Sequence, residues 1–99
     1  MSTRAQYMAE YHARNRGRKY GLTPEQYDEL EAASGGLCAI CEQPPSGKRD
    51  RLMIDHCHAT NRVREMLCLK CNVALGLLGE DPALMVRAAL YIRKHRAAA

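Results

Sequence analysis

The pattern of apolar and polar residues divides the chain into short elements separated by turn signals. Residues 3–19 permit either a helix or a flexible basic arm. Residues 23–26 (Thr-Pro-Glu-Gln) predict the start of a second helix, with Thr23 as N-cap, proline in the first turn and Gln26 completing a capping box. The small residues from Ser34 onward predict its end.

The middle of the chain has the pattern of a hairpin. Residues 52–54 and 63–67 have strand character, and residues 59–62 suit the turn between them. Asn61 is the turn residue that best tolerates a left-handed backbone. Residues 44–47 (Pro-Pro-Ser-Gly) predict a loop before the first strand.

Two more helices are predicted after the hairpin. Residues 71–78 have helical periodicity, and Asp81-Pro82 is typical of a helix start. The last helix carries an apolar stripe that suits either core packing or a dimer interface, formed by Met85, Ala88, Ala89 and Ile92.

Four of the five cysteines form two CxxC pairs, Cys38/Cys41 and Cys68/Cys71. Each pair places two thiolates on one tight turn, and two such turns complete a tetrahedral zinc site. Plain zinc ribbons have about 15–20 residues between the pairs, whereas here 26 residues (42–67) separate them. The fifth, Cys57, is interpreted as a small packed residue.

Composition limits the size of the core. The 99 residues include no Phe, no Trp and five Tyr, so a structural metal is expected to contribute to folding. Paired cysteines without a signal-peptide pattern indicate an intracellular, reducing location, and no run is long enough to span a membrane. We therefore expect the cytoplasm, that of a bacterial host if the protein is phage-encoded.

The net charge of +4 is unevenly distributed. Residues 1–20 carry five basic residues against Glu10 alone, whereas residues 21–37 carry four acids and no base. Basic residues predominate again between residues 48 and 70 and at the C-terminus. Basic segments around a site favour a polyanion such as DNA, although a solvated basic surface gives the same pattern.

Asp55, His56 and His58 lie in the long segment between the cysteine pairs, and Asn72 directly follows Cys71. Carboxylate and amide oxygens suit Mg²⁺ or Mn²⁺ better than they suit a thiolate-bound zinc. A neutral His56 beside them has the chemistry to deprotonate water. On a regular strand Asp55 and His56 point to opposite faces, so both reach one site only if the strand ends or bends there.

These residues also carry a family resemblance. The runs Asp55–His58, Thr60–Arg64 and Leu67–Asn72, together with Leu37–Cys41, resemble the phage recombination endonuclease VII family of HNH, or ββα-metal, nucleases. The chain has Glu65 where family relatives have glycine, which adds a negative side chain to a strand expected to face DNA.

The resemblance implies roles for individual residues. Asp55 and Asn72 would bind a catalytic Mg²⁺ or Mn²⁺, His56 would act as general base, and His58 would support the phosphate or transition state. The four paired cysteines would hold structural zinc. Three basic residues are candidate phosphate contacts, with solvated hairpin charges as the alternative: Arg62, Arg64 and Lys70.

The expected fold is therefore a small α+β protein. Residues 1–22 form a basic arm or helix, residues 23–79 a zinc-stapled ββα-metal core, and residues 80–99 a helix that covers the core or forms a dimer interface. The expected function is Mg²⁺-dependent cleavage of branched DNA such as Holliday junctions by a homodimer. The alternatives are an HNH nicking or restriction-type nuclease on duplex DNA and a non-catalytic zinc module that binds nucleic acid.

Overall fold

The computed structural model describes residues 3–46 and 51–97, so that Gly47 of the predicted loop lies outside the described residues. The elements follow the order α1 (Arg4–Arg14), η1 (Arg18–Tyr20), α2 (Pro24–Ser34), β1 (Met53–His56), β2 (Val63–Leu67), α3 (Leu69–Leu77) and α4 (Pro82–Ala97). The predicted small α+β class is confirmed. No helix among the described residues is long and apolar enough to cross a membrane.

A two-stranded antiparallel hairpin forms the centre of the molecule. Ile54 pairs with Met66 and His56 with Val63, so the register shifts at Asp55. The strand is therefore irregular at the point where the sequence requires a bend. Asn61 has φ 59°, as predicted for the turn, and its amide donates to the Cys57 carbonyl at 2.6 Å.

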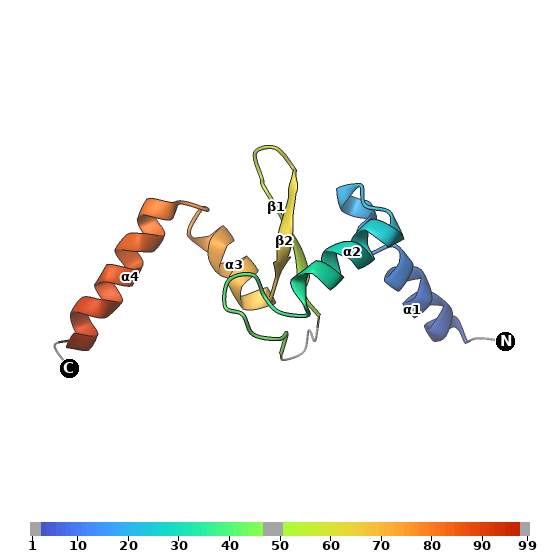
Figure 1. Cartoon of the computed structure of the whole chain (residues 1–99), viewed down its shortest axis with the longest axis horizontal. Helices are drawn as coiled ribbons and strands as arrows, with labels where there is room; N and C mark the ends of the chain where they lie inside the picture. The colour runs from blue at the N-terminus through green and yellow to red at the C-terminus, as the bar shows by residue number, and fades with distance from the viewer. Residues whose placement is uncertain (1–2, 47–50, 98–99) are drawn as a thin grey trace.

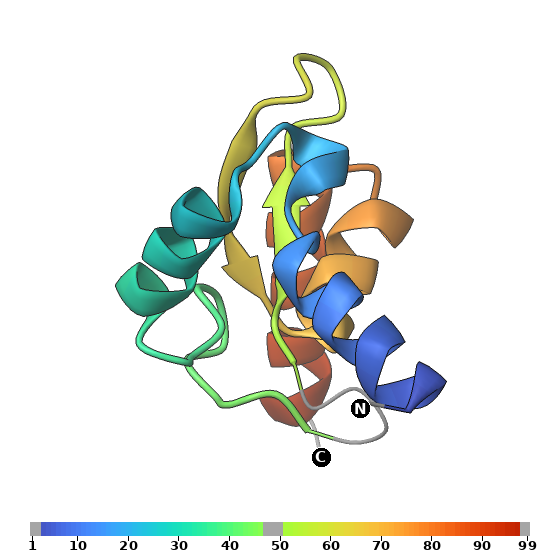
Figure 2. The ribbon, with the colours of Figure 1, turned by 90° about the vertical axis from the view of Figure 1, so that its right-hand side faces the viewer.

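Helices flank the hairpin on both sides. α2 contacts β2 and α3 contacts β1, which places the hairpin between the two helices (Figure 2). The predicted start of α2 is confirmed, because the Thr23 hydroxyl accepts from the Gln26 amide and the Gln26 side chain accepts from the Thr23 amide. α1 has the same capping box at Thr3 and Gln6, so the N-terminal segment begins as a helix.

The buried core is small and rich in sulfur. Met66 and Cys38 are its most buried side chains, each 1% exposed. Among the residues that the structure describes, the buried apolar side chains are Tyr27, Cys38, Leu52, Ile54, Met66, Leu67, Cys68 and Cys71. Three of these eight are cysteines, so the core continues directly into the cysteine cluster.

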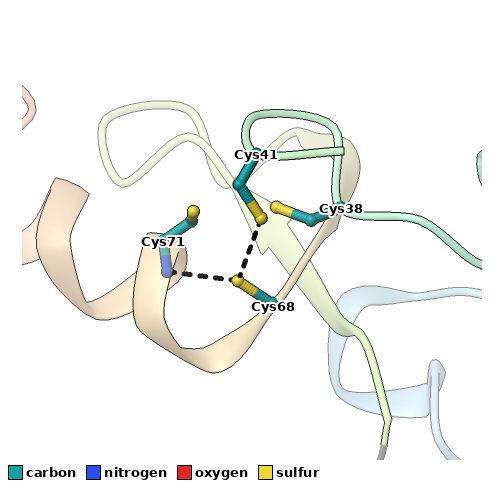
Figure 3. A group of neighbouring side chains, drawn as sticks. All are labelled: Cys38, Cys41, Cys68 and Cys71. Carbon is teal, nitrogen blue, oxygen red and sulfur yellow. Dashed lines mark hydrogen bonds between the residues drawn. The ribbon is translucent and has the colours of Figure 1, made fainter. Parts of the chain in front are cut away.

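The four paired cysteines converge between the α2–β1 loop and the start of α3 (Figure 3). Their sulfur atoms all lie within 4.8 Å of one another, and the Sγ atoms of Cys41 and Cys68 are 3.8 Å apart. Backbone amides support the sulfurs: Ile40 donates to Cys38 Sγ at 3.4 Å, and Cys71 donates to Cys68 Sγ at 3.5 Å. The four cysteines are therefore arranged to hold a metal ion.

Electrostatics within the cluster favour a bound cation. Burial on its own raises the pKa of Cys38, but amide hydrogen bonds from Cys41, Cys68 and Ile40 outweigh it and lower that pKa to about 6. Burial, hydrogen bonding with the neighbouring thiols and repulsion from Cys38 together raise the pKa of Cys71 to about 12, with burial as the largest cause. A negative charge on one sulfur thus disfavours deprotonation of the next, and a bound dication would neutralise the repulsion between them.

The terminal helices extend away from this core. α1 and α4 lie at opposite ends of the long axis of the molecule, which measures 63 × 30 × 22 Å (Figure 1). Of the predicted stripe on α4, Met85 and Ala88 are half-buried, whereas Ala89 and Ile92 are exposed. No residue of α4 belongs to the core described above.

We expect the Cys71→Ser variant to lose the metal ion from the cluster and with it the cooperative unfolding transition. The reason is that both the ligand set and the core lose a member. Elemental analysis should fall from about one ion per chain to nearly none, and thermal unfolding followed by circular dichroism should broaden.

Cys57→Ser is the matched control, because Cys57 lies on the hairpin outside the cluster. It should retain both the metal and the sharp transition. A Cys71→Ser protein that unfolds as sharply as the wild type without metal would contradict a structural role for the cluster.

Candidate functional site

A hollow of about 540 Å³ lies beside β1 and α3, and we call it the central hollow. Three of the predicted functional residues line it: His56, His58 and Asn72. The other lining residues come from the N-terminal segment, α2, the β1 region and α3: Arg16, Lys19, Tyr20, Tyr27, Arg51, Leu52, Met53, Ile54 and Gly76. Residues far apart in the sequence therefore share one concave surface.

The two histidines are neighbours at the end of β1. The ring centroids of His56 and His58 are 4.7 Å apart, and the His56 ring lies 5.0 Å from the ring of Tyr20. His56 is half-buried, whereas the side chain of His58 is 67% exposed. His56 is thus held between two aromatic neighbours while His58 faces solvent.

The position of Asn72 follows from the cysteine cluster. Asn72 is the residue after Cys71 in α3, and its amide donates to the Cys68 carbonyl at 3.0 Å. Its side-chain nitrogen lies 3.9 Å from the sulfur of Met53 in β1. The end of the cluster and the first strand together therefore hold Asn72 at the edge of the hollow.

Asp55 makes a different set of contacts. Its carboxylate is buried, with the residue 7% exposed, and accepts two hydrogen bonds from Arg64 on β2. Arg64 Nε lies 2.5 Å from Oδ2 and Nη2 lies 3.0 Å from Oδ1. Asp55 is not among the residues that line the central hollow. The structure thus places it beside that hollow, paired with an arginine.

Glu80 connects Arg64 to the histidines. Its carboxylate accepts from Arg64 Nη2, and its other oxygen lies 3.9 Å from Nε2 of His58. The hydrogen bonds to Asp55 and Glu80 raise the pKa of Arg64 above its ordinary value. Contacts therefore run without a break from His56 through His58, Glu80 and Arg64 to Asp55.

Sequence reasoning did not find Glu80. It lies in a turn after α3 with φ 53°, and the sequence there, just before Asp81-Pro82, was interpreted only as a helix start. No local pattern identifies its role, because its partners Arg64 and His58 are 16 and 22 residues away in the sequence.

The three predicted phosphate contacts do not line the central hollow. Arg64 is paired with two carboxylates, Arg62 is exposed in the hairpin turn, and Lys70 lines a separate hollow with Cys41 and Gln43. Among the described residues, the cations that line the central hollow are Arg16, Lys19 and Arg51, which sequence reasoning did not single out.

Glu65 does not line the central hollow. It lines another hollow, together with residues of α2 and the first cysteine pair that include Leu30 and Cys38. Its carboxylate is therefore not part of the surface that carries the histidines.

Comparison with known proteins shows a family to which the chain is similar. A family model described as recombination endonuclease VII matches residues 13–94. The chain is 42% identical over 76 residues to the Gene 59 protein of Mycobacterium phage D29, covering 76% of this chain and 46% of that protein. It is 43% identical over 53 residues to the Gene 59 protein of Mycobacterium phage L5, covering 54% of this chain and 32% of that protein.

The chain thus spans less than half the length of either curated relative. No solved structure matches it significantly. The family match extends from the end of α1 to the last helix and includes the cysteine cluster, the hairpin and every residue of the Asp55–Arg64–Glu80 network. On this evidence the chain belongs to the recombination endonuclease VII family.

Proposed function

We propose that the chain is a metal-dependent DNA endonuclease that hydrolyses phosphodiester bonds, with branched DNA as its preferred substrate. In this proposal β1, β2 and α3 act as a ββα-metal, HNH-like motif, and the four paired cysteines hold structural zinc. The observation that carries the proposal is that His56, His58 and Asn72 share one hollow, with Asp55 next to His56 on the same strand. Family membership supports it independently.

The proposed roles follow from the surroundings of each residue. His56, half-buried against Tyr20, is the general base that takes a proton from the attacking water. His58, exposed and near Glu80, is proposed to donate to a phosphate oxygen. Bound Mg²⁺ or Mn²⁺ would supply charge neutralisation at the phosphate and the leaving oxygen.

The donor set fits such a metal by its chemistry. Asp55 offers a buried carboxylate and Asn72 an amide oxygen, and hard cations prefer oxygen donors. Both Asp55 oxygens accept from Arg64, so a metal must compete with the guanidinium for them. Glu80 offers Arg64 a second partner, which lets Arg64 release Asp55 without losing every counter-charge.

The alternatives make different use of the same residues. A nicking or restriction-type nuclease would keep the chemistry of His56 and differ only in its DNA substrate. A non-catalytic zinc module needs the cysteine cluster alone and has no use for a hollow that joins two histidines and Asn72. We therefore favour the nuclease.

Replacing His56 with alanine should lower the cleavage rate by about 10²–10⁴-fold, the usual contribution of a general base. Zinc content and DNA affinity should persist, since His56 is assigned to neither. The measurement is single-turnover cleavage of labelled DNA with Mg²⁺ added.

His95→Ala on α4 is the control, because it removes an exposed histidine far along the chain from the hollow. It should cleave at the wild-type rate. Normal cleavage by His56→Ala would assign the base to another group, with His58 as the first to test.

Replacing Arg64 with glutamine should strengthen Mn²⁺ binding about 3- to 10-fold. This is the equivalent of the ~1 kcal/mol expected for one partly exposed ion pair. The physical reason is that, without the Arg64 guanidinium, the metal has no competitor for the carboxylate oxygens of Asp55. Isothermal titration of zinc-loaded protein with Mn²⁺ measures the change.

Arg62→Gln removes the same charge from the same hairpin, and Arg62 makes no ion pair within the described part of the chain. It should change Mn²⁺ affinity by less than about twofold, since an exposed, unpaired charge is well screened. Weaker Mn²⁺ binding by Arg64→Gln would contradict the proposal that Arg64 and the metal compete for Asp55.

Selectivity for branched DNA should come from a homodimer that holds two sites at a fixed separation. The exposed apolar side chains of α4 are the proposed interface. Light scattering should report a dimer, and a four-way junction should outcompete linear duplex of equal length.

Ile92→Glu on the α4 stripe should give a monomer that has lost this preference. Leu77→Glu makes the same kind of change at an exposed residue of α3 and should leave the dimer intact. A wild-type monomer that cuts both DNAs equally would contradict the proposed selectivity for branched DNA. It would not contradict the proposed role of His56 in cleavage.

A further inference from the structure

We propose that the N-terminal segment 16–20, together with Arg51, forms a phosphate-binding site beside His56 that grips a backbone phosphate flanking the cleaved one. We call it the flanking-phosphate site. The inference rests on the proposed nuclease function only for the identity of the cleaved bond. The binding site itself is argued from the geometry and charge of the central hollow.

The wall of the hollow is strongly one-sided in charge. Three cations line it, Arg16, Lys19 and Arg51, and no carboxylate does so among the described residues. The nearest acids of the site, Asp55 and Glu80, are paired with Arg64 outside this lining. Grouped cations on a concave, partly shielded surface attract an anion more strongly than the same charges spread over an open surface.

Arg16 is the residue that most requires a ligand. Its Nε is buried, yet it has no hydrogen-bond partner within the part of the chain that the structure describes. A buried donor without an acceptor is unfavourable, and buried polar groups in folded proteins are nearly always paired. A phosphate offers the acceptor geometry that a guanidinium matches with two parallel hydrogen bonds.

The segment is held rigidly enough to form a site. The Gly17 carbonyl accepts from the amides of Tyr20 at 3.0 Å and Leu22 at 2.9 Å, which closes a compact turn. Gly17 packs so closely on Leu22 that an added Cβ would lie 2.6 Å from the Leu22 Cβ. Tyr20 and Leu22 in turn pack against the core. The turn is thus fixed before any ligand binds.

Tyr20 links this turn to the proposed chemistry. Its ring lies 5.0 Å from the ring of His56, and Lys19 Nζ lies 5.7 Å from the centre of the same Tyr20 ring. Lys19 and His56 are therefore separated by about one aromatic side chain. Since successive nucleotides rise about 3.4 Å along one strand, the cations suit a phosphate roughly one to three nucleotides from the cleaved bond.

Free phosphate and a phosphodiester share this chemistry, so the test must separate them. We favour the phosphodiester, because the hollow continues from the cations to His56 and His58 and so accommodates more than one phosphate group along its surface. Inorganic phosphate should then bind only weakly, in the millimolar range typical of a single isolated charge contact.

The experiment measures binding of duplex or junction DNA without divalent metal, as a function of NaCl concentration. Arg16→Gln and Lys19→Gln should each weaken binding about 3- to 10-fold at moderate salt. Each should also reduce the slope of log K against log [salt] by about 0.9, the value of one phosphate contact. Arg16→Lys should restore the slope and only part of the affinity, since lysine cannot make two parallel hydrogen bonds.

Arg18→Gln is the matched control within the same segment, because Arg18 is exposed and does not line the hollow. It should keep the wild-type slope. Thermal unfolding and zinc content should be measured for every variant, and exposed Lys19 gives a test that does not depend on how well Arg16→Gln folds.

The outcomes separate this inference from the nuclease proposal. An unchanged slope in both Arg16→Gln and Lys19→Gln, or an equal loss in Arg18→Gln, would overturn the flanking-phosphate site even if the protein cleaves DNA. Tight, micromolar binding of inorganic phosphate that needs Arg16 would reassign the site to a free anion and also overturn it. Reduced slopes in Arg16→Gln and Lys19→Gln but not in Arg18→Gln, in a protein that never cleaves DNA, would support the flanking-phosphate site and count against the nuclease.

Discussion

The cysteine cluster is the constraint on which the rest of the structure depends. It joins the loop after α2 to the first residues of α3, and three of its members are also core residues. The chain between the two pairs must return to its starting point, and it does so as the β1–β2 hairpin. The cluster therefore fixes both the orientation of α3, which carries Asn72, and the position of the strand that carries His56. With so few buried apolar side chains, packing alone would define these positions less well.

Two regions of different charge lie next to each other at the hairpin. On the central hollow, cations gather beside the histidines, and no carboxylate of the described residues belongs to the lining. Next to it, Arg64 is enclosed by Asp55 and Glu80. The register shift at Asp55 makes this division possible, because Arg64 and Glu65 both lie opposite the single residue Asp55. A regular hairpin would offer only one β2 residue at that point and would fix its side chain on one face.

Features with local causes could be predicted from the sequence, and features with distant causes could not. The start of α2 at Thr23 and the left-handed turn at Asn61 depend on neighbouring residues alone, and both agree with the structure. The sequence also determines which residues share a face of α3. Lys70 and Asn72 are two residues apart, about 200° around a helix, so they face different sides. Glu80 and Arg16 acquire their surroundings only through tertiary folding, and no spacing rule connects either of them to His56.

The site thus combines two levels of rigidity that serve different chemical needs. The proposed general base and metal ligands must be held within a fraction of an ångström, and the residues assigned to these roles lie on the strand and on the helix that follows the cysteine cluster. Binding of a backbone phosphate tolerates more movement, because charge attraction varies slowly with distance. The N-terminal turn, anchored to the core through Leu22 and Tyr20, meets this weaker requirement. In the proposed function Tyr20 links this turn to His56, since a DNA strand attracted by Arg16 and Lys19 would also be drawn along the hollow toward the histidines.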